Sequence, residues 1–106
     1  MRLTGPTIAV LEQFLAAPDE SRYGLDLGTR TALPSGTIHP ILARLEAVGW
    51  VRSEWERIDP ATAGRPRRRW YRLTPEGRSA AAEQVARAHA RRARLTTRLR
   101  PVQGLS

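Results

Sequence analysis

Apolar residues recur at helical spacing near the start of the chain. In residues 7–17, TIAVLEQFLAA, one face carries Ile8, Leu11 and Leu15, which predicts a helix over this segment. A shorter helix is expected over residues 23–31, YGLDLGTRT, where the leucines follow a helical spacing. The polar stretch between the two segments is expected to be a loop.

The most regular apolar stripe lies in residues 36–48, GTIHPILARLEAV. Its apolar side chains follow the i, i+3, i+4, i+7 pattern of an amphipathic helix, with Val48 as an extension: Ile38, Ile41, Leu42 and Leu45. Ser35 is placed to cap the start of this helix, and Gly49 fits the position that follows a helix end. Pro40 falls inside the segment and removes one backbone hydrogen bond. Because the stripe is unbroken on both sides of Pro40, we expect the helix to continue through it.

Two later segments alternate in the way that β-strands do. They are residues 51–57, VRSEWER, and residues 68–74, RRWYRLT, and the turn-rich sequence between them contains Asp-Pro, Gly64 and Pro66. The faces that we expect to be covered are Val51, Ser53 and Trp55 in the first strand and Tyr71 and Leu73 in the second. The two strands with their loop predict a β-hairpin.

A long helix is predicted after the hairpin. Thr74 is a suitable N-cap, Pro75 a suitable first helical residue, and Glu76 an acid in the first turn. From there to about Arg100 the chain is rich in alanine, arginine and glutamate with little to break a helix, which gives a helix of about 25 residues.

This order of elements predicts a winged helix-turn-helix, in which the second helix of a pair enters the major groove of DNA. We expect a mainly α protein with a small β-hairpin and a long C-terminal dimerisation helix. Residues 1–74 are expected to form the DNA-binding domain, and residues 75–106 the dimerisation helix and a frayed tail.

Positive charge is concentrated in the second part of the chain. Residues 1–64 hold six arginines and eight acids, a net charge of −2, whereas residues 65–106 hold twelve arginines and two acids, a net charge of +10, which sum to the +8 of the whole chain. Such an asymmetric field favours an anionic partner, either nucleic acid or anionic lipid, over a merely solvated surface.

Composition limits the other classes of protein. There is no cysteine, so neither a disulfide framework nor a thiolate metal site can form. No apolar run approaches the roughly 20 residues that span a bilayer, and the first residues lack the features of a signal peptide. We therefore expect a cytoplasmic protein.

Four stretches of sequence resemble one known family. They are YGLDL at 23–27, LPSGTIHPILARLEAVGWV at 33–51, SEWE at 53–56 and GRPRRRWYRLTPEGR at 64–78. Over about residues 7–80 the chain resembles the PadR family of bacterial winged helix-turn-helix transcriptional regulators. It departs from that family at His39, where a tyrosine is usual. It also has no aromatic residue after Tyr71, whereas relatives that bind flat ligands use aromatics between C-terminal helices.

The resemblance implies that the partner is double-stranded DNA, and it assigns the contacts. The helix that begins near Ser35 would meet the DNA with its first turns, and the arginines around the hairpin loop would grip phosphates or a narrow minor groove. Ser35 could instead only cap, His39 only face solvent, and Arg44 pair with an acid. The candidate DNA-binding residues are Tyr23, Ser35, Gly36, Thr37, His39, Arg44, Arg65, Arg67, Arg68 and Arg69.

The last helix is expected to need a partner helix, because a body of this size cannot cover its apolar side. The resemblance implies a homodimer on an inverted-repeat operator, acting as a repressor, with an effector of unknown identity and no cofactor. The candidate dimer residues are Leu11, Val85, Ala88, Leu95 and Leu99. The apolar side of this helix is mostly alanine without Trp or Phe, which argues against a membrane surface.

Other functions find less support in the sequence. His39 and His89 belong to different elements, and no phosphate-binding loop or metal-binding spacing is present, so we expect no enzymatic activity. The tryptophans could stack on single-stranded bases, but strand alternation favours packing within the hairpin. The alternative that stays open is a protein-interaction module whose basic face binds an acidic protein partner.

Overall fold

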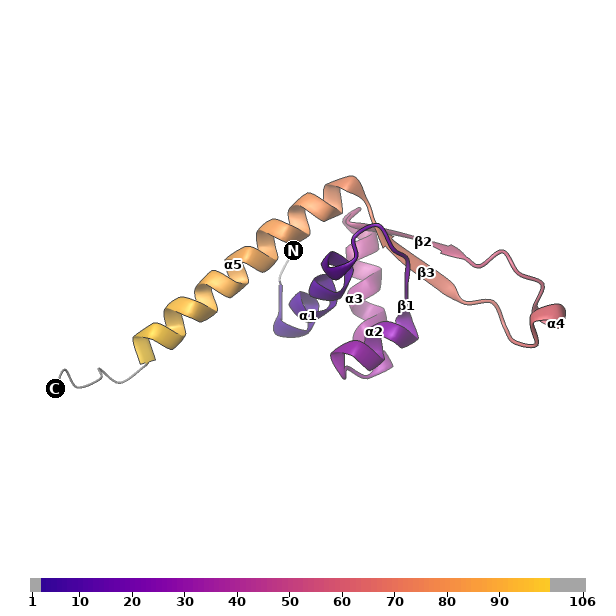
Figure 1. The fold of residues 1–106 in the computed structure, drawn as a ribbon, viewed down its shortest axis with the longest axis horizontal. Helices are drawn as coiled ribbons and strands as arrows, with labels where there is room; N and C mark the ends of the chain where they lie inside the picture. The colour runs from indigo at the N-terminus through magenta and orange to yellow at the C-terminus, as the bar shows by residue number, and fades with distance from the viewer. Residues whose placement is uncertain (1–2, 100–106) are drawn as a thin grey trace.

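The computed structural model describes residues 3–99, which form five helices and three short strands (Figure 1). In chain order these are α1 (Gly5–Ala16), β1 (Arg22–Tyr23), α2 (Gly24–Thr31), α3 (Ser35–Ala47), β2 (Val51–Trp55), α4 (Pro60–Ala63), β3 (Arg69–Leu73) and α5 (Pro75–Leu99). The predicted fold class, mainly α with a β-hairpin and a long last helix, is confirmed.

The sheet has three strands rather than the two that were predicted. Strand β1 pairs with β3 on the side opposite β2, so that the order is β1-β3-β2 and both pairings are antiparallel. Tyr23 therefore ends a strand, and α2 begins one residue later than predicted. A strand of two residues carries no alternation, which is why the sequence pattern could not reveal it.

Helix α3 ends as predicted but begins differently. Gly49 has φ +79°, its N–H bonds the carbonyl of Glu46, and the N–H of Trp50 bonds the carbonyl of Leu45, which is a Schellman motif. The predicted cap at Ser35 is wrong. Pro34 occupies the N-cap position without a side-chain hydrogen bond, and Ser35 is already the first helical residue. Pro34 has extended backbone angles (φ −70°, ψ 156°), which suit that position.

Helix α1 begins two residues earlier than predicted, because Thr4 caps it. The Thr4 hydroxyl accepts a hydrogen bond from the N–H of Thr7, and Pro6 is tolerated in the first turn. Helix α5 starts as predicted, since Thr74 Oγ1 accepts from the N–H of Gly77 at 2.9 Å.

One apolar core joins the helices to the base of the sheet. Its members come from α1, α2, α3, β2, β3 and the first part of α5: Val10, Leu11, Phe14, Leu27, Ile38, Ile41, Leu42, Leu45, Val51, Leu73, Ala81 and Val85. The predicted stripe of α3 is buried from Ile38 to Leu45, but Val48, which was expected to extend it, is 45% exposed at the end of the helix. The division of the chain at residue 74 stays a prediction, but the first turns of α5 share this core with α1.

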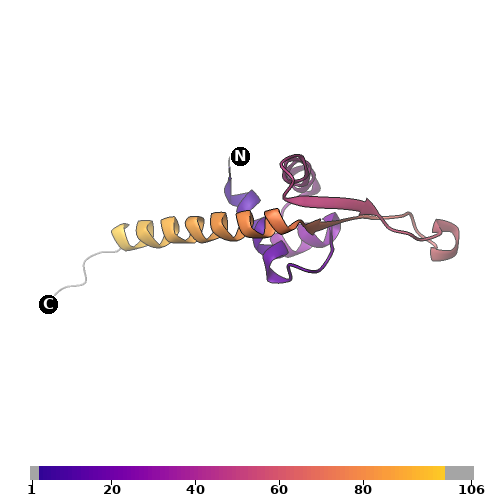
Figure 2. The ribbon, with the colours of Figure 1, turned by 90° about the horizontal axis from the view of Figure 1, so that it is seen from above.

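Two arms extend in opposite directions from the body (Figures 1 and 2). One is the later part of α5, and the other is the segment between β2 and β3, residues 56–68, which we call the wing and which includes α4. The radius of gyration is 17.4 Å, whereas a compact domain of this length has about 13 Å. Both arms therefore present surface that the body of the chain does not cover.

Candidate nucleic-acid interface

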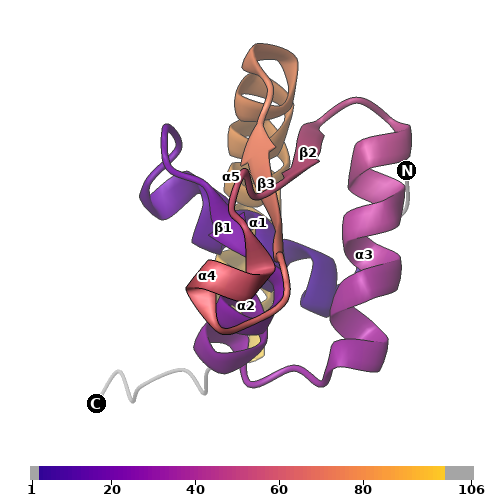
Figure 3. The same cartoon turned by 90° about the vertical axis from the view of Figure 1, so that its right-hand side faces the viewer.

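The outer face of α3 is open, as a helix that reads DNA requires. Opposite its buried stripe, Ser35, Gly36, His39 and Arg44 are exposed, and Thr37 is half-buried. Seen from the wing end, α3 lies at the edge of the body, to one side of the strands (Figure 3). These five predicted residues thus lie at or near the surface of one helix.

His39 also leans toward the start of α2. A Cβ on Gly24 would stand 3.3 Å from Cε1 of the imidazole, closer than most such contacts, so the absence of a side chain at Gly24 lets His39 lie there. The histidine is consequently positioned by a neighbouring element, although it is solvent-exposed.

A hollow of about 250 Å³ brings four of the predicted DNA-binding residues together. Tyr23, His39, Arg68 and Arg69 line it; its other walls are Gly24, Leu25, Trp55 and Tyr71. These residues come from β1, α2, α3, β2, the wing and β3. We call it the α2–β3 hollow, and it connects the first turns of α3 with the base of the wing.

Arg69 is held inside this hollow by three contacts. Its Nε donates to Ser53 Oγ at 2.9 Å, its Nη2 lies 3.9 Å from Glu46 Oε2, and its guanidinium sits over the Trp55 ring at 5.3 Å. The exposed Glu46–Arg69 pair contributes little by itself. Together the contacts fix the direction of the Arg69 side chain.

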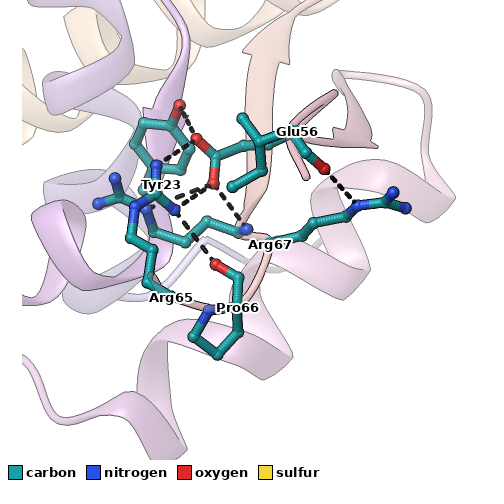
Figure 4. A network of polar contacts seen from close by, with 7 residues as sticks. Tyr23, Glu56, Arg65, Pro66 and Arg67 are labelled. Carbon is teal, nitrogen blue, oxygen red and sulfur yellow. Dashed lines mark hydrogen bonds and ion pairs between the residues drawn. The ribbon is translucent and has the colours of Figure 1, made fainter. Parts of the chain in front are cut away.

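Glu56 accepts the hydrogen bonds that hold the base of the wing together (Figure 4). Arg65 grips it with two hydrogen bonds, Nη1 to Oε1 at 2.7 Å and Nη2 to Oε2 at 3.1 Å. The backbone N–H of Arg68 donates to Oε1 at 2.8 Å, and the Tyr23 hydroxyl donates to Oε2 at 3.3 Å. The Arg65 hydrogen bond, opposed by desolvation, lowers the pKa of Glu56 from 4.5 to about 2, and Arg65 in turn has a raised pKa.

The wing arginines therefore differ in how free they are. Arg65 is committed to Glu56 and to the carbonyl of Pro66, and Arg68 lies over the Tyr23 ring at 4.8 Å. Arg67 is exposed and donates only from Nε, to the carbonyl of Ile58 at 2.9 Å. Its terminal guanidinium nitrogens have no hydrogen bond to the residues that the structure describes.

Sequence reasoning missed Glu56 and misplaced Trp55. The only signal for Glu56 was its position in SEWE, because its partners Tyr23 and Arg65 are distant along the chain. Trp55 was expected to be covered with Val51, but 56% of it is exposed at the end of β2. In contrast, Trp50 and Tyr71 pack against the core as predicted.

The predicted dimer residues fall into three groups. Leu11 and Val85 are buried in the core of their own chain, which corrects their assignment, because almost none of either side chain is left for a partner to contact. Ala88 is half-buried and Leu95 is 55% exposed on the arm of α5. Leu99 ends that helix, and its side chain lies outside the described residues.

Comparison with known proteins settles the family. Residues 19–83, more than half of the chain, match the model of the transcriptional regulator PadR-like family. The chain belongs to the PadR-like family. No curated protein sequence gives a significant match.

Solved structures share the fold of this PadR-like chain. A PadR family transcription regulator from Clostridium difficile superimposes with a TM-score of 0.68 at 20% identity, over 88% of this chain and 98% of that one. The PcaV regulator of Streptomyces coelicolor gives a TM-score of 0.72 at 24% identity, over 93% of this chain but 64% of PcaV. BpsR of Bordetella bronchiseptica gives a TM-score of 0.71 at 22% identity, over 93% of this chain and 69% of BpsR. At these identities the likeness shows the fold, and the PadR-like chain spans under two thirds of PcaV.

The family and these structural neighbours are transcription regulators rather than enzymes. Among residues 3–99 no group of histidine, aspartate and glutamate side chains is arranged to hold a metal ion. In this part of the chain no helix combines the length and the apolar character that crossing a membrane requires.

Proposed function

We propose that this PadR-like protein is a homodimeric repressor that binds an inverted-repeat operator with α3 in the major groove and the wing against the adjacent backbone. The observation that carries the proposal is the α2–β3 hollow, whose lining includes His39 of α3, Arg68 at the base of the wing and Arg69 of β3. A duplex lying on α3 would therefore also meet arginines, as a winged helix requires.

In this proposal the residues have distinct tasks. The uncapped first turn of α3, with Ser35, Gly36 and Thr37, approaches the bases or a phosphate, because helix N-termini favour anions. His39 and Arg44 contact the backbone from the exposed face. Arg67 reaches along the groove from the wing, and the other predicted residues near it, Arg65 and Arg68 of the wing with Tyr23 of β1 and Arg69 of β3, support it or contact phosphates next to it.

The dimer is proposed from the uncovered arm of α5. Leu95 is a large apolar side chain with 55% of its surface exposed on a helix that continues past the body. A second copy of α5 would cover it and place two α3 helices about 34 Å apart, one turn of DNA. Ala88 and Leu99 belong to the same proposed contact.

An effector forms the last part of the proposal. PcaV was solved with its natural ligand, and the DNA binding of BpsR is regulated by 6-hydroxynicotinic acid. In this chain a groove of about 410 Å³ between α1 and α5 is within the usual range for a small-molecule site. Its lining includes Arg91 and Arg92 together with His89, which pairs with Glu12 at 3.0 Å, so the two arginines are the groups that would hold an anionic ligand.

The test is selection of binding sites from a pool of random DNA duplexes, followed by measurement of the mass of the complex. The proposal predicts an enriched inverted repeat with half-sites one helical turn apart and two chains per duplex. Enrichment of no sequence would contradict it. Retention of acidic proteins in place of DNA would favour the protein-interaction module.

A further inference from the structure

The wing lacks an apolar anchor. Residues 59–64 and 66–68 are exposed, and none of residues 56–68 contributes to the core. The regular pairing of β2 with β3 stops at Trp55 and Arg69, and only the N–H of Glu56 continues it by bonding the carbonyl of Arg68 at 2.9 Å. Core packing therefore does not set the position of the wing, and its polar contacts become important.

Glu56 gathers those polar contacts. Its Oε1 accepts from Arg65 Nη1 and from the N–H of Arg68, and its Oε2 accepts from Arg65 Nη2 and the Tyr23 hydroxyl. Its side chain is 10% exposed, although it sits at the base of an exposed arm. Charge-assisted, bidentate bonds of this kind are the stronger ones, and they also fix geometry.

Tyr23 connects this cluster to the body. Within residues 3–99, every hydrogen bond, ion pair and cation–π contact that leaves the wing for an element other than β2 and β3 goes to Tyr23. The hydroxyl bonds Glu56 and the ring lies under the Arg68 guanidinium. Tyr23 immediately precedes α2, the helix that packs against α3. The contact therefore fixes the wing relative to the helix-turn-helix.

We propose that Glu56 is a specificity-determining positioning residue, which holds the wing at a fixed place relative to α3 by binding Arg65 and Arg68 and anchoring both on Tyr23. The inference rests on the proposed DNA-binding function. Glu56 adds a negative charge close to the proposed path of DNA, so it opposes nonspecific attraction. By fixing the wing, Glu56 favours binding only of a duplex whose groove matches the position of the wing. Arg65 is then a structural cross-link, and Arg67 a direct contact.

The variant that tests this is Glu56→Gln, which keeps the shape and one acceptor oxygen but removes the charge. Glu54→Gln is the matched control. It makes the same change of charge two residues earlier, near the end of β2, at an exposed side chain that has no hydrogen bond or ion pair among the described residues. Affinities are measured for the selected operator and for a scrambled duplex of equal length and composition, at one fixed salt concentration.

We expect Glu56→Gln to weaken operator binding about tenfold, because the charged hydrogen bonds of one side chain are lost. The scrambled duplex should be bound as well as before or more tightly. Glu54→Gln should shift both duplexes together and leave their ratio unchanged. If both variants shift the two duplexes in parallel, Glu56 acts only through its charge, and the proposal is overturned.

A measurement without DNA separates this inference from the proposed function. Amide hydrogen exchange at Arg68 and across residues 57–67 should be faster in Glu56→Gln than in the unaltered protein or in Glu54→Gln. Unchanged exchange would overturn the inference even if operator binding is normal. Faster exchange in a protein that binds no duplex selectively would instead contradict the proposed function. Should Glu56→Gln fail to fold, Tyr23→Phe, which removes only the hydroxyl, must show a smaller change in the same direction.

Discussion

The backbone of Gly77 lies directly against the carbonyl group of Trp50. A Cβ placed on Gly77 would stand 1.8 Å from that oxygen, and the glycine is buried. Thr74 adds to the junction, since its hydroxyl lies 2.6 Å from the Gly49 carbonyl and its N–H bonds the carbonyl of Trp50. The start of α5 is thereby joined to the turn between α3 and β2, so the arm that is proposed to dimerise is attached rigidly to the helix that is proposed to read DNA.

Replacement of Gly77 by alanine should destabilise the protein. Alanine favours a helix by up to about 1 kcal/mol over glycine, but here the clash with backbone dominates, and we expect a net loss of about 1–3 kcal/mol in the free energy of unfolding. Urea denaturation measures it. Gly5→Ala is the control, because a Cβ at Gly5 meets nothing within 4 Å. Equal urea midpoints for the two variants would contradict a destabilising clash between a Cβ at position 77 and the carbonyl group of Trp50.

The stability of the protein should depend on pH through Glu56. The hydrogen bond from Arg65 is the largest cause that lowers its pKa from 4.5 to about 2, and the Arg68 N–H adds to it. A carboxylate whose pKa is lowered by folding contributes stability that is present above pH 4.5 and is lost as the pH falls toward 2. The urea midpoint of Glu56→Gln should therefore change less over this range than that of the unaltered protein. Parallel curves would contradict the cause assigned here.

Local features of the fold could be predicted from the sequence because neighbouring residues decide them. Gly49 stops α3 through its own positive φ, and Thr74, Pro75 and Glu76 start α5 by capping and charge. The stripe of α3 shows its buried face since the 3.6-residue period is a property of one helix. The family resemblance combined these elements correctly.

Features that depend on distant residues could not be predicted. The Tyr23–Glu56 bond spans 33 positions along the chain, and the strand that positions Tyr23 has two residues. Alternation gave the face on which Trp55 lies but not whether another element covers that face. In the same way, the spacing of Leu11 and Val85 showed an apolar face without showing that α1 and α5 of one chain cover each other.

The exposed face of α3 should determine operator affinity. His39→Ala and Arg44→Ala should each weaken binding of the selected duplex by about 1–3 kcal/mol, with unchanged thermal stability, because both side chains point away from the core. A contact to phosphate would lower the affinity for every duplex, whereas a contact to a base would relax the selection at one position. The control is Arg87→Ala, at an exposed arginine on α5 that pairs only with Glu83 among the described residues. Equal losses for all three would show a general effect of charge.

Leu95 should hold the proposed dimer together. Leu95→Glu places a charge where a second α5 would cover an apolar side chain, and the lost burial of about 1.5–3 kcal/mol per leucine corresponds to at least a tenfold weaker dimer. Sedimentation equilibrium measures the association. Leu25→Glu is the control, because Leu25 is 75% exposed but lies on α2. A dimer that is unaffected by Leu95→Glu would exclude this part of α5 from the contact.

The most direct measurement is the salt dependence of binding to the selected inverted repeat. Fluorescence anisotropy measures this binding for the unaltered protein and for Arg67→Ala. If the wing and α3 neutralise phosphates, log K falls linearly with log salt, and loss of Arg67 from both subunits reduces the slope by about 1.8, or about 0.9 for each contact removed. Affinity that does not change with salt, or an Arg67→Ala slope identical to that of the unaltered protein, would contradict DNA recognition by this face of the molecule.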